Sequence, residues 1–403
     1  MKTNTAASEY SNKQGVTPGV VVQRTRDLVP ILRQRAGQTE TLRRLPDETV
    51  QDFRHAGLFR ILQPARFGGH EMPLNALIDI ATEAGRGCGS SGWCLSLLAA
   101  HNWLITLFHE EVQQEVFGDN PDTLVATSFA AQGKANQVPG GYRLSGRWQF
   151  SSGCDHSQWV TVVGTLEFGA STASDEARLF LLPRRDCQID DTWFVAGLRG
   201  TGSKDIVVED VFVPAHRTFS LAEAEAGTTP GAGTHVAPLY QLPFTAVLIM
   251  AAAGPALGIG LGALETYQEW MRSRVVTYSG AKMVHLAPVQ IRLAESTADI
   301  DAAQLLLHRD CEAMMRIVTE GERLSVQQRA RYRWDGAYAV ALCTRAVDRL
   351  FAASGGHSLY DRHPLQRAFR DLHAMSAHAF LNPDVAGELF GRIALGLEPN
   401  GII

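Results

Sequence analysis

The sequence predicts an α+β protein in three consecutive parts: an N-terminal helical domain, a central antiparallel β domain and a C-terminal helical bundle. Apolar residues recur at three- and four-residue steps over residues 21–121 and again over 237–403, as amphipathic helices require. Residues 122–236 instead hold short segments rich in valine, threonine and aromatic residues, separated by glycine, proline and asparagine or aspartate. These two changes of pattern set the predicted domain boundaries.

The composition is that of an ordinary soluble globular protein, with 403 residues, a formal net charge of −5 and a hydrophobic fraction of 45%. No basic stripe or block is present, so nothing favours nucleic-acid binding. Six scattered cysteines form no CxxC pair and no metal-ligand cluster, which indicates reduced thiols and no metal site. Residues 1–20 are polar and lack an apolar signal segment, so we expect a disordered N-terminus and a cytoplasmic protein.

Local signals define the expected helices. Leu45-Pro46-Asp47 marks the end of one helix and the start of the next. Residues 76–108 keep a helical pattern around a glycine- and serine-rich interruption at Gly85–Gly92. Phe244–Leu264 carries no charge and is long enough to span a bilayer. Its glycines suit close helix packing and no other segment is similar, so we interpret it as a helix buried at the centre of the bundle, with no membrane.

The stretch Phe150–Trp159, FSSGCDHSQW, gathers serine, aspartate and histidine as a hydrolase triad would. In an extended strand, however, the neighbouring Asp155 and His156 point to opposite faces and cannot both serve one serine. No GxSxG elbow accompanies them. We therefore expect Asp155 and His156 to anchor a turn through bonds to the backbone.

Two later segments are rich in glycine. Residues 197–218, GLRGTGSKDIVVEDVFVPAHRT, crowd glycine and hydroxyl residues ahead of a strand, so that backbone N–H groups can approach a polar ligand such as a phosphate. A tight turn without a ligand explains this segment equally well. Residues 351–380, FAASGGHSLYDRHPLQRAFRDLHAMSAHAF, run from a helix through a loop into a new helix that carries Arg370-Asp371.

Together these segments resemble the acyl-CoA dehydrogenase superfamily. The matches occur in the family's order and cover nearly the whole chain: LPDETVQDFRHAGLFRILQPARFGG, the strand ending in FSSG, GLRGTGS…DVFVP, and SGG…PLQRAFRD. The resemblance implies an N-terminal helical domain, a central antiparallel β-barrel-like domain and a C-terminal four-helix bundle. It also implies a flavin held at their junction in a homotetramer.

The dehydrogenases of this superfamily abstract a proton with a glutamate, and neither of its two positions holds a carboxylate here. About nine residues after Arg370-Asp371 the chain has Ser376–Phe380, and about eight residues before the first glycine-proline of the bundle it has Ala246–Leu248. Without a base, desaturation of an acyl thioester has no mechanism. The first position offers His373 and His378 instead, about 140° apart around a helix, so they form no zinc pair and only one would face the pocket.

This pattern is similar to that of the oxygenase components of two-component aromatic hydroxylases, with further matching segments GSSGWCLSLLAAHNW, FSSGCDHSQW and GLRGTGS. These enzymes act on 4-hydroxyphenylacetate, on a phenolic secosteroid or on the sulfur of dibenzothiophene. The resemblance implies reduced flavin, either FADH2 or FMNH2, delivered by a separate NAD(P)H:flavin reductase, with O2 as co-substrate. A C4a-hydroperoxyflavin would then hydroxylate an aromatic small molecule of phenolic or polycyclic type.

The resemblance also assigns site residues. Ser152 matches the hydroxyl at the family's strand end and is expected near flavin N5. His378 is expected to act as acid or base, with His373 as the alternative, and His101 is a further pocket candidate. The remaining cofactor-binding candidates are Trp148 (flavin wall or core), Thr201, Gly202, Ser203, the loop Ser354, Gly355 and Gly356, and Arg274 from a neighbouring subunit. Arg272 is so close in sequence to Arg274 that the two could be confused in this assignment.

Three other functions stay open at this point. One is an N- or S-oxygenating flavin monooxygenase of the same fold. Another is an acyl-CoA dehydrogenase or oxidase with an unrecognised base, which a tightly bound yellow FAD and reduction by an acyl-CoA would support. The third is a flavin-fold scaffold without catalysis that serves as a binding partner.

Overall fold

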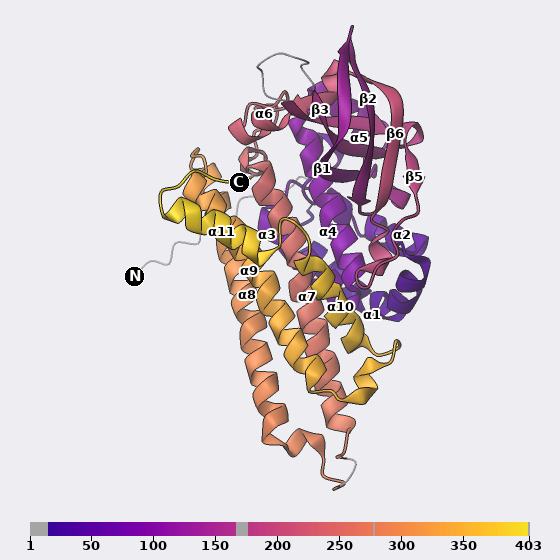
Figure 1. Ribbon diagram of the computed structural model, residues 1–403, viewed down its shortest axis with the longest axis vertical. Helices are drawn as coiled ribbons and strands as arrows, with labels where there is room; N and C mark the ends of the chain where they lie inside the picture. The colour runs from indigo at the N-terminus through magenta and orange to yellow at the C-terminus, as the bar shows by residue number, and fades with distance from the viewer. Residues whose placement is uncertain (1–14, 167–175, 277–278, 402–403) are drawn as a thin grey trace.

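The computed structural model describes residues 15–166, 176–276 and 279–401, and has helical, sheet and helical parts in the predicted order (Figure 1). The first part contains α1 (Pro18–Leu42), α2 (Asp47–His55), α3 (Leu74–Gly87), α4 (Gly89–Leu104) and α5 (Glu110–Phe117). The break between α1 and α2 and the break between α3 and α4 fall at the two interruptions seen in the sequence. α1 begins inside the stretch for which the sequence predicts disorder, and residues 1–14 lie outside the described residues.

The central part is a seven-stranded sheet with the order β5-β6-β2-β1-β3-β4-β7. Its strands are β1 (Val125–Val138), β2 (Gly141–Ser151), β3 (Trp159–Leu166), β4 (Glu176–Pro183), β5 (Gln188–Asp190), β6 (Lys204–Pro214) and β7 (Thr218–Ser220). The expectation of an antiparallel domain needs a correction, because β1 and β3 pair in parallel while the other described pairings are antiparallel. After the β1–β2 hairpin the chain crosses to the other side of β1, which makes β3 run in the direction of β1.

Trp148 belongs to the core of this sheet, which is one of the two places, flavin wall or core, that the sequence left open for it. Its side chain is fully buried, and its indole N–H donates to the carbonyl oxygen of Val163 at 2.7 Å. A Cβ on Gly133 would lie 2.0 Å from its ring, so glycine there leaves the space that the indole fills. The pairing of β2 with β6 shifts register between Trp148 and Ser151, and Phe150 within the shift has φ 69°. Because of this irregularity, the side chains at the end of β2 do not continue the buried face of the sheet on which Trp148 lies.

The C-terminal part is a helical bundle that continues below the sheet in Figure 1. After the short α6 (Leu221–Ala226) it consists of α7 (Phe244–Ser273), α8 (Ala287–Thr319), α9 (Val326–Ala352) and α10 (Pro364–Ser376), with α11 (Pro383–Ala394) packed on α9. α7 is long and apolar enough to cross a membrane, but 89% of its most apolar stretch is buried inside the protein. Glycine lets α7 pack closely on α3: a Cβ on Gly258 would lie only 2.1 Å from the carbonyl oxygen of Thr82.

A buried hydrogen bond joins the bundle to the loop before β6. Asp371 of α10 is 2% exposed, and its Oδ1 accepts the backbone N–H of Leu198 at 2.6 Å. Leu198 has φ 50°, in the left-handed region that costs a non-glycine residue energy. Beside it, a Cβ on Gly197 would lie 1.9 Å from the carbonyl oxygen of Arg370. α10 therefore fixes the position of the loop at residues 197–203.

Asp371 should give the protein a pH-dependent stability. Burial raises the pKa of Asp371 to about 6, above its value of about 3.9 in an unfolded chain. Between these values the folded state holds a proton that the unfolded state has released, so the contribution of Asp371 to stability falls as the pH rises from about 4 to about 6. Asp371→Asn keeps an acceptor for Leu198 but does not titrate.

We therefore expect the free energy of unfolding of the wild type, relative to Asp371→Asn, to decrease by about 2–3 kcal/mol across that window. Urea titrations of both proteins at several pH values from 4 to 8 measure it. A difference that stays constant over this range contradicts the prediction.

Candidate active site

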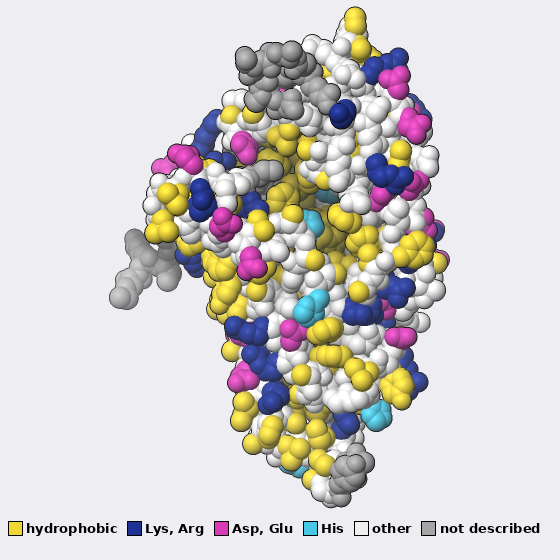
Figure 2. Space-filling model, in the orientation of Figure 1, with side chains coloured by type: hydrophobic (Ala, Val, Ile, Leu, Met, Phe, Trp, Pro, Cys, Tyr) yellow, Lys and Arg dark blue, Asp and Glu magenta, His cyan; other side chains and the backbone are white. Residues whose placement is uncertain are grey.

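A cavity of about 640 Å³ lies where the three parts meet. Figure 2 shows the surface hollowed between the sheet and the bundle, with hydrophobic side chains around the hollow. The walls come from α4, β1, the end of β2, the loop before β6, α7, α9, α11 and the segment from α10 to Phe380. None of the described lining residues is an acid, and the polar ones other than tryptophan are His101, Thr127, Ser128, Gln149, Ser152, Ser203, Arg333 and His378. An apolar cavity of this size with a few polar groups is typical of a small-molecule site.

Ser152 stands in the turn directly after β2 and is 6% exposed. The turn needs Gly153, whose φ of 70° lies in the left-handed region and where a Cβ would lie 3.0 Å from the Leu98 side chain. The Ser152 hydroxyl accepts the indole N–H of Trp93 at 3.0 Å and lies 2.7 Å from the hydroxyl of Ser203. Two hydrogen bonds therefore hold this hydroxyl at the cavity wall.

A chain of hydrogen-bonded hydroxyl groups leads from Ser203 away from the cavity. The Ser203 hydroxyl lies 2.6 Å from that of Thr201, and the Thr201 hydroxyl donates to the carbonyl oxygen of Leu198 at 2.9 Å. Of the loop residues predicted to bind the cofactor, Ser203 lines the cavity, whereas Thr201 and Gly202 lie outside its lining. Thr201 reaches the cavity only through Ser203.

His101 of α4 lines the cavity although it is 2% exposed. Its Nδ1 lies 2.9 Å from the carbonyl oxygen of Val125. Because a carbonyl only accepts, Nδ1 carries the ring proton and Nε2 keeps its lone pair. Burial lowers the pKa of His101 to about 4, so the ring is neutral at pH 7 and Nε2 is an acceptor.

His378 also lines the cavity, but as the opposite tautomer. α10 ends at Ser376, so His378 lies in the following turn and the helix does not continue through it. Its Nδ1 accepts the backbone N–H of Phe380 at 3.3 Å, which leaves the proton of the neutral ring on Nε2. Burial lowers the pKa of His378 to about 4. Its ring packs edge-on against Trp93, with ring centroids 5.5 Å apart.

His373, the alternative to His378, lies outside the cavity lining. It is exposed, and its Nε2 lies 2.9 Å from Oδ1 of Asp348 on α9. The physical reason is helix geometry: His373 is still inside α10, on the side that faces α9, while the chain turns before His378. The structure thus brings Ser152, Ser203, His101 and His378 together and leaves His373 apart.

The candidates for phosphate binding form a second group at the end of the bundle away from the sheet (Figure 1). The guanidinium of Arg274 donates to the carbonyl oxygen of Ser354 at 2.6 Å and lies over the Trp270 ring. A Cβ on Gly355 would lie 3.5 Å from the same guanidinium, and Gly356 follows. Because Leu248 and Ala252 of α7 line the cavity and Arg274 follows the end of that helix, the two groups are roughly 35 Å apart along its axis.

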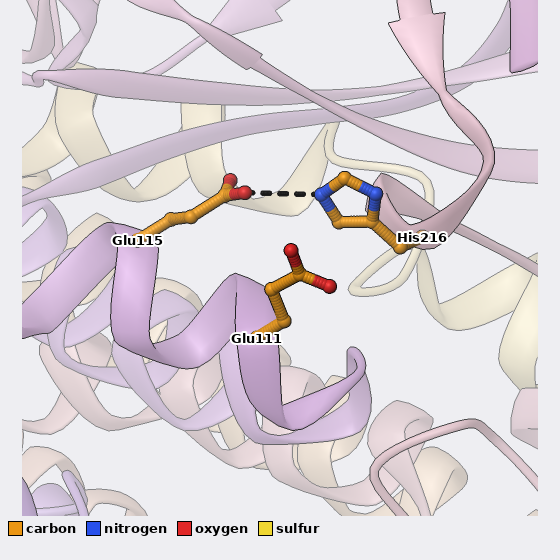
Figure 3. A group of neighbouring side chains, drawn as sticks. All are labelled: Glu111, Glu115 and His216. Carbon is orange, nitrogen blue, oxygen red and sulfur yellow. Dashed lines mark hydrogen bonds and ion pairs between the residues drawn. The ribbon is translucent and has the colours of Figure 1, made fainter. Parts of the chain in front are cut away.

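One group of carboxylates and histidine in the described residues has the composition of a metal site (Figure 3). Glu111 and Glu115 come from α5 and His216 from the segment after β6. The two oxygens of Glu115 are already engaged, one 3.0 Å from Nε2 of His216 and the other accepting Nε–H of Arg217 at 2.6 Å. These contacts describe an ion-pair cluster on the outside of the protein that joins α5 to the sheet.

Sequence reasoning missed several residues of the cavity. Trp93 lies within the quoted segment GSSGWCLSLLAAHNW, yet its bond to Ser152 has no sequence signal because the two residues are on different elements. Arg333 of α9 lines the cavity with its guanidinium 5.5 Å from the centroid of the Phe380 ring, and burial lowers its pKa. Arg333 is one of five arginines in a long helix, and such residues are taken for surface residues until the packing is known.

Known proteins resemble this chain along almost its whole length. Residues 250–383 match the family described as acyl-CoA dehydrogenase, C-terminal domain. The oxygenase subunit HsaA of a flavin-dependent monooxygenase from Rhodococcus jostii is 36% identical, over 93% of this chain and 98% of that protein. The oxygenase component of an FADH2-dependent resorcinol hydroxylase from Rhizobium sp. is also 36% identical, over 94% and 95%.

A solved structure supports the same relationship. XiaF from Streptomyces sp., in complex with FADH2 and glycerol, superimposes with a TM-score of 0.89 at 30% identity, covering 96% of this chain and 97% of that chain. At this identity and coverage the likeness extends over all three parts of the fold. The chain therefore belongs to the oxygenase subunits of flavin-dependent monooxygenases, within the acyl-CoA dehydrogenase superfamily.

Proposed function

We propose that this protein is the oxygenase component of a two-component system that uses reduced flavin and O2 to hydroxylate an aromatic, phenolic small molecule. The observation that carries the proposal is the cavity, where a buried hydroxyl, an acceptor imidazole and a donor imidazole converge on apolar walls. Acyl-CoA dehydrogenation needs a carboxylate base. The described lining residues supply none, which disfavours that alternative.

The described residues fit a flavin ring. Phe150 and Trp193 line the cavity as an aromatic pair with centroids 5.9 Å apart, and aromatic faces suit a planar ring. Ser152 adds one polar contact for a ring nitrogen. When bound, reduced flavin supplies the electrons that activate O2. The apolar walls would keep water away from the reacting atoms.

The polar residues of the cavity suit a phenolic substrate. Nε2 of His101 would accept a hydrogen bond from a phenol hydroxyl, while the Nε2–H of His378 would donate a hydrogen bond to an oxygen atom. Arg333 is the one charged side chain among the described lining residues, and its positive charge favours a phenolate. We assign Ser152 to flavin N5.

The phosphates of the flavin would be bound by a second copy of the chain. The group formed by Arg274 and the loop 354–356 offers a guanidinium and a glycine-rich backbone, which suit phosphate. It lies too far along α7 to line the same chain's cavity, so we place it against the cavity of a neighbouring subunit in a homotetramer. A separate NAD(P)H:flavin reductase would deliver the reduced flavin, in the cytoplasm.

Ser152→Ala should uncouple flavin oxidation from hydroxylation. The change removes the one hydroxyl that we place at flavin N5, and preorganised hydrogen bonds to reacting groups contribute factors of about 10²–10³. We expect the yield of hydroxylated product per reduced flavin consumed to fall by about tenfold or more. Ser151→Ala is the matched control, because Ser151 is the neighbouring buried serine and lies outside the described lining. Equal yields in the two variants would contradict the role of Ser152.

His378→Ala and His373→Ala separate the two histidines near the end of α10. Loss of a positioned donor or base typically costs about 10²–10⁴ in rate. We expect His378→Ala to lower the single-turnover rate of product formation by about 10²-fold. His373→Ala should change this rate by less than about threefold, because His373 contacts Asp348 and Phe369 and lies outside the cavity lining. The reverse order of effects would assign the role to His373.

Arg274→Ala should weaken binding of the flavin through its phosphates. We expect the Kd of reduced FMN or FAD to rise by about tenfold or more, as is typical when a charge-assisted hydrogen bond is lost. The Kd of lumiflavin, which has no phosphate, should stay unchanged. Arg272→Ala controls for charge, because Arg272 is exposed two residues away. If Arg272→Ala has the larger effect, the phosphate assignment moves to Arg272.

A further inference from the structure

A second cavity, of about 460 Å³, lies next to the active-site cavity. Its walls come from residues 106–107, 224–244 and 318–329, and it shares no described lining residue with the active-site cavity. We propose that this outer cavity is a further part of the substrate-binding site, which holds the far end of a phenol longer than one ring. The inference rests on the proposed function, since it needs a phenol beside His101 and His378.

Two helices place the cavities one helical turn apart. On α7, Leu248 lines the active-site cavity and Phe244 lines the outer cavity. On α9, Arg333 lines the active-site cavity and Arg329 lines the outer cavity. Residues four apart lie on the same face of a helix, about 6 Å from each other along its axis. The outer cavity therefore continues the active-site cavity along the same faces of α7 and α9.

Two aromatic rings stand between the cavities. Phe129 of β1 lines the active-site cavity, Phe244 lines the outer cavity, and their ring centroids are 6.2 Å apart. α4 passes this partition in the opposite direction, because His101 lies on the active-site side and Thr106, just after the helix, lies on the outer side. The partition is formed by side chains, so a change of the Phe244 rotamer would join the two spaces.

The size of the active-site cavity gives the outer cavity a use. Its volume of about 640 Å³ has to hold the flavin ring as well as the phenol. A substrate with a long chain or further rings then needs additional space beyond the phenol. The outer cavity supplies adjacent space of comparable size, at the end of the active-site cavity that Phe129 closes.

Arg329 gives the outer cavity a hydrogen-bond donor. Arg329 is half-buried, and its Nε is buried without a hydrogen-bond partner in the part of the chain that the structure describes. A buried N–H of this kind is stabilised by an acceptor on a ligand. Arg323 fixes the wall beside it by donating to the carbonyl oxygen of Ala226 at 2.8 Å. Because the exposed Glu225 and Glu322 also line the cavity, we assign it an oxygen acceptor, which a carbonyl or a carboxylate provides.

Two matched ligands test the donor at Arg329. They are p-heptylphenol and ω-(p-hydroxyphenyl)heptanoate, which have similar lengths and differ in the carboxylate at the far end. The Kd of each is measured by calorimetry with reduced FMN present and O2 excluded, so that no turnover occurs. We expect the wild type to bind the carboxylate about tenfold or more tightly, and Arg329→Ala to lower this preference about tenfold, as for the loss of a hydrogen bond to a charged group.

Arg316→Ala is the matched control for charge. Arg316 is exposed on α8 and lies outside the described linings of both cavities, so this variant should keep the wild-type preference. The methyl ketone of the same chain length distinguishes the two acceptors. A gain equal to that of the carboxylate assigns a neutral hydrogen bond, a gain of the carboxylate alone assigns the charge of Arg329, and either gain supports the inference.

Phe244→Trp tests the partition and keeps the test open if Arg329→Ala does not fold. A larger ring should weaken binding of the heptanoate relative to p-cresol, which fits in the active-site cavity alone, by about tenfold, as is usual for overpacking. The inference is overturned if Arg329→Ala keeps the wild-type preference and Phe244→Trp weakens both ligands equally. A wild type that hydroxylates p-cresol but gains nothing from the longer ligands loses only this inference. A wild type that binds no phenol overturns the proposed function together with it.

Discussion

The backbone of Leu198, held by Asp371, is the constraint on which the active site depends. Its N–H is fixed by a carboxylate from α10, and its carbonyl receives the hydroxyl of Thr201. The backbone at Leu198 is left-handed, a conformation that persists only where the surroundings enforce it. Through Leu198 the C-terminal bundle positions the loop before β6, and that loop contacts the hydroxyl of Ser152 through Ser203.

Much of the fold was open to prediction because local chemistry determines it. The order of helical, sheet and helical parts follows from hydrophobic periodicity, and breaks such as the one at Leu45-Pro46-Asp47 follow from residues that end or begin helices. The buried position of α7 was inferred from its glycines, which the close contact of Gly258 with α3 explains. The parallel pairing of β1 with β3 was not predicted, because strand direction depends on how the chain crosses between strands.

Site residues within a family motif could be predicted from the sequence, whereas residues placed by tertiary packing could not. The resemblance led to Ser152, Ser203, His101 and His378, which the fold brings to one cavity. The sequence left Trp148 open between flavin wall and core. Strict alternation along the strand would put Trp148 and Ser152 on one face. The register shift and the left-handed Phe150 between them break that alternation, and neither feature has a recognisable sequence signal. The end of α10 before His378 is likewise a matter of tertiary structure.

Backbone groups set the polarity of the two histidines of the cavity. The carbonyl of Val125 makes Nε2 of His101 an acceptor, and the N–H of Phe380 makes Nε2 of His378 a donor. Backbone amides do not titrate, and burial keeps the pKa of both histidines near about 4. The pattern of donors and acceptors is therefore constant over the neutral pH range. An oxygenase that must hold a reactive flavin in a water-poor cavity gains from such a pattern, because no proton has to move before the ligands bind.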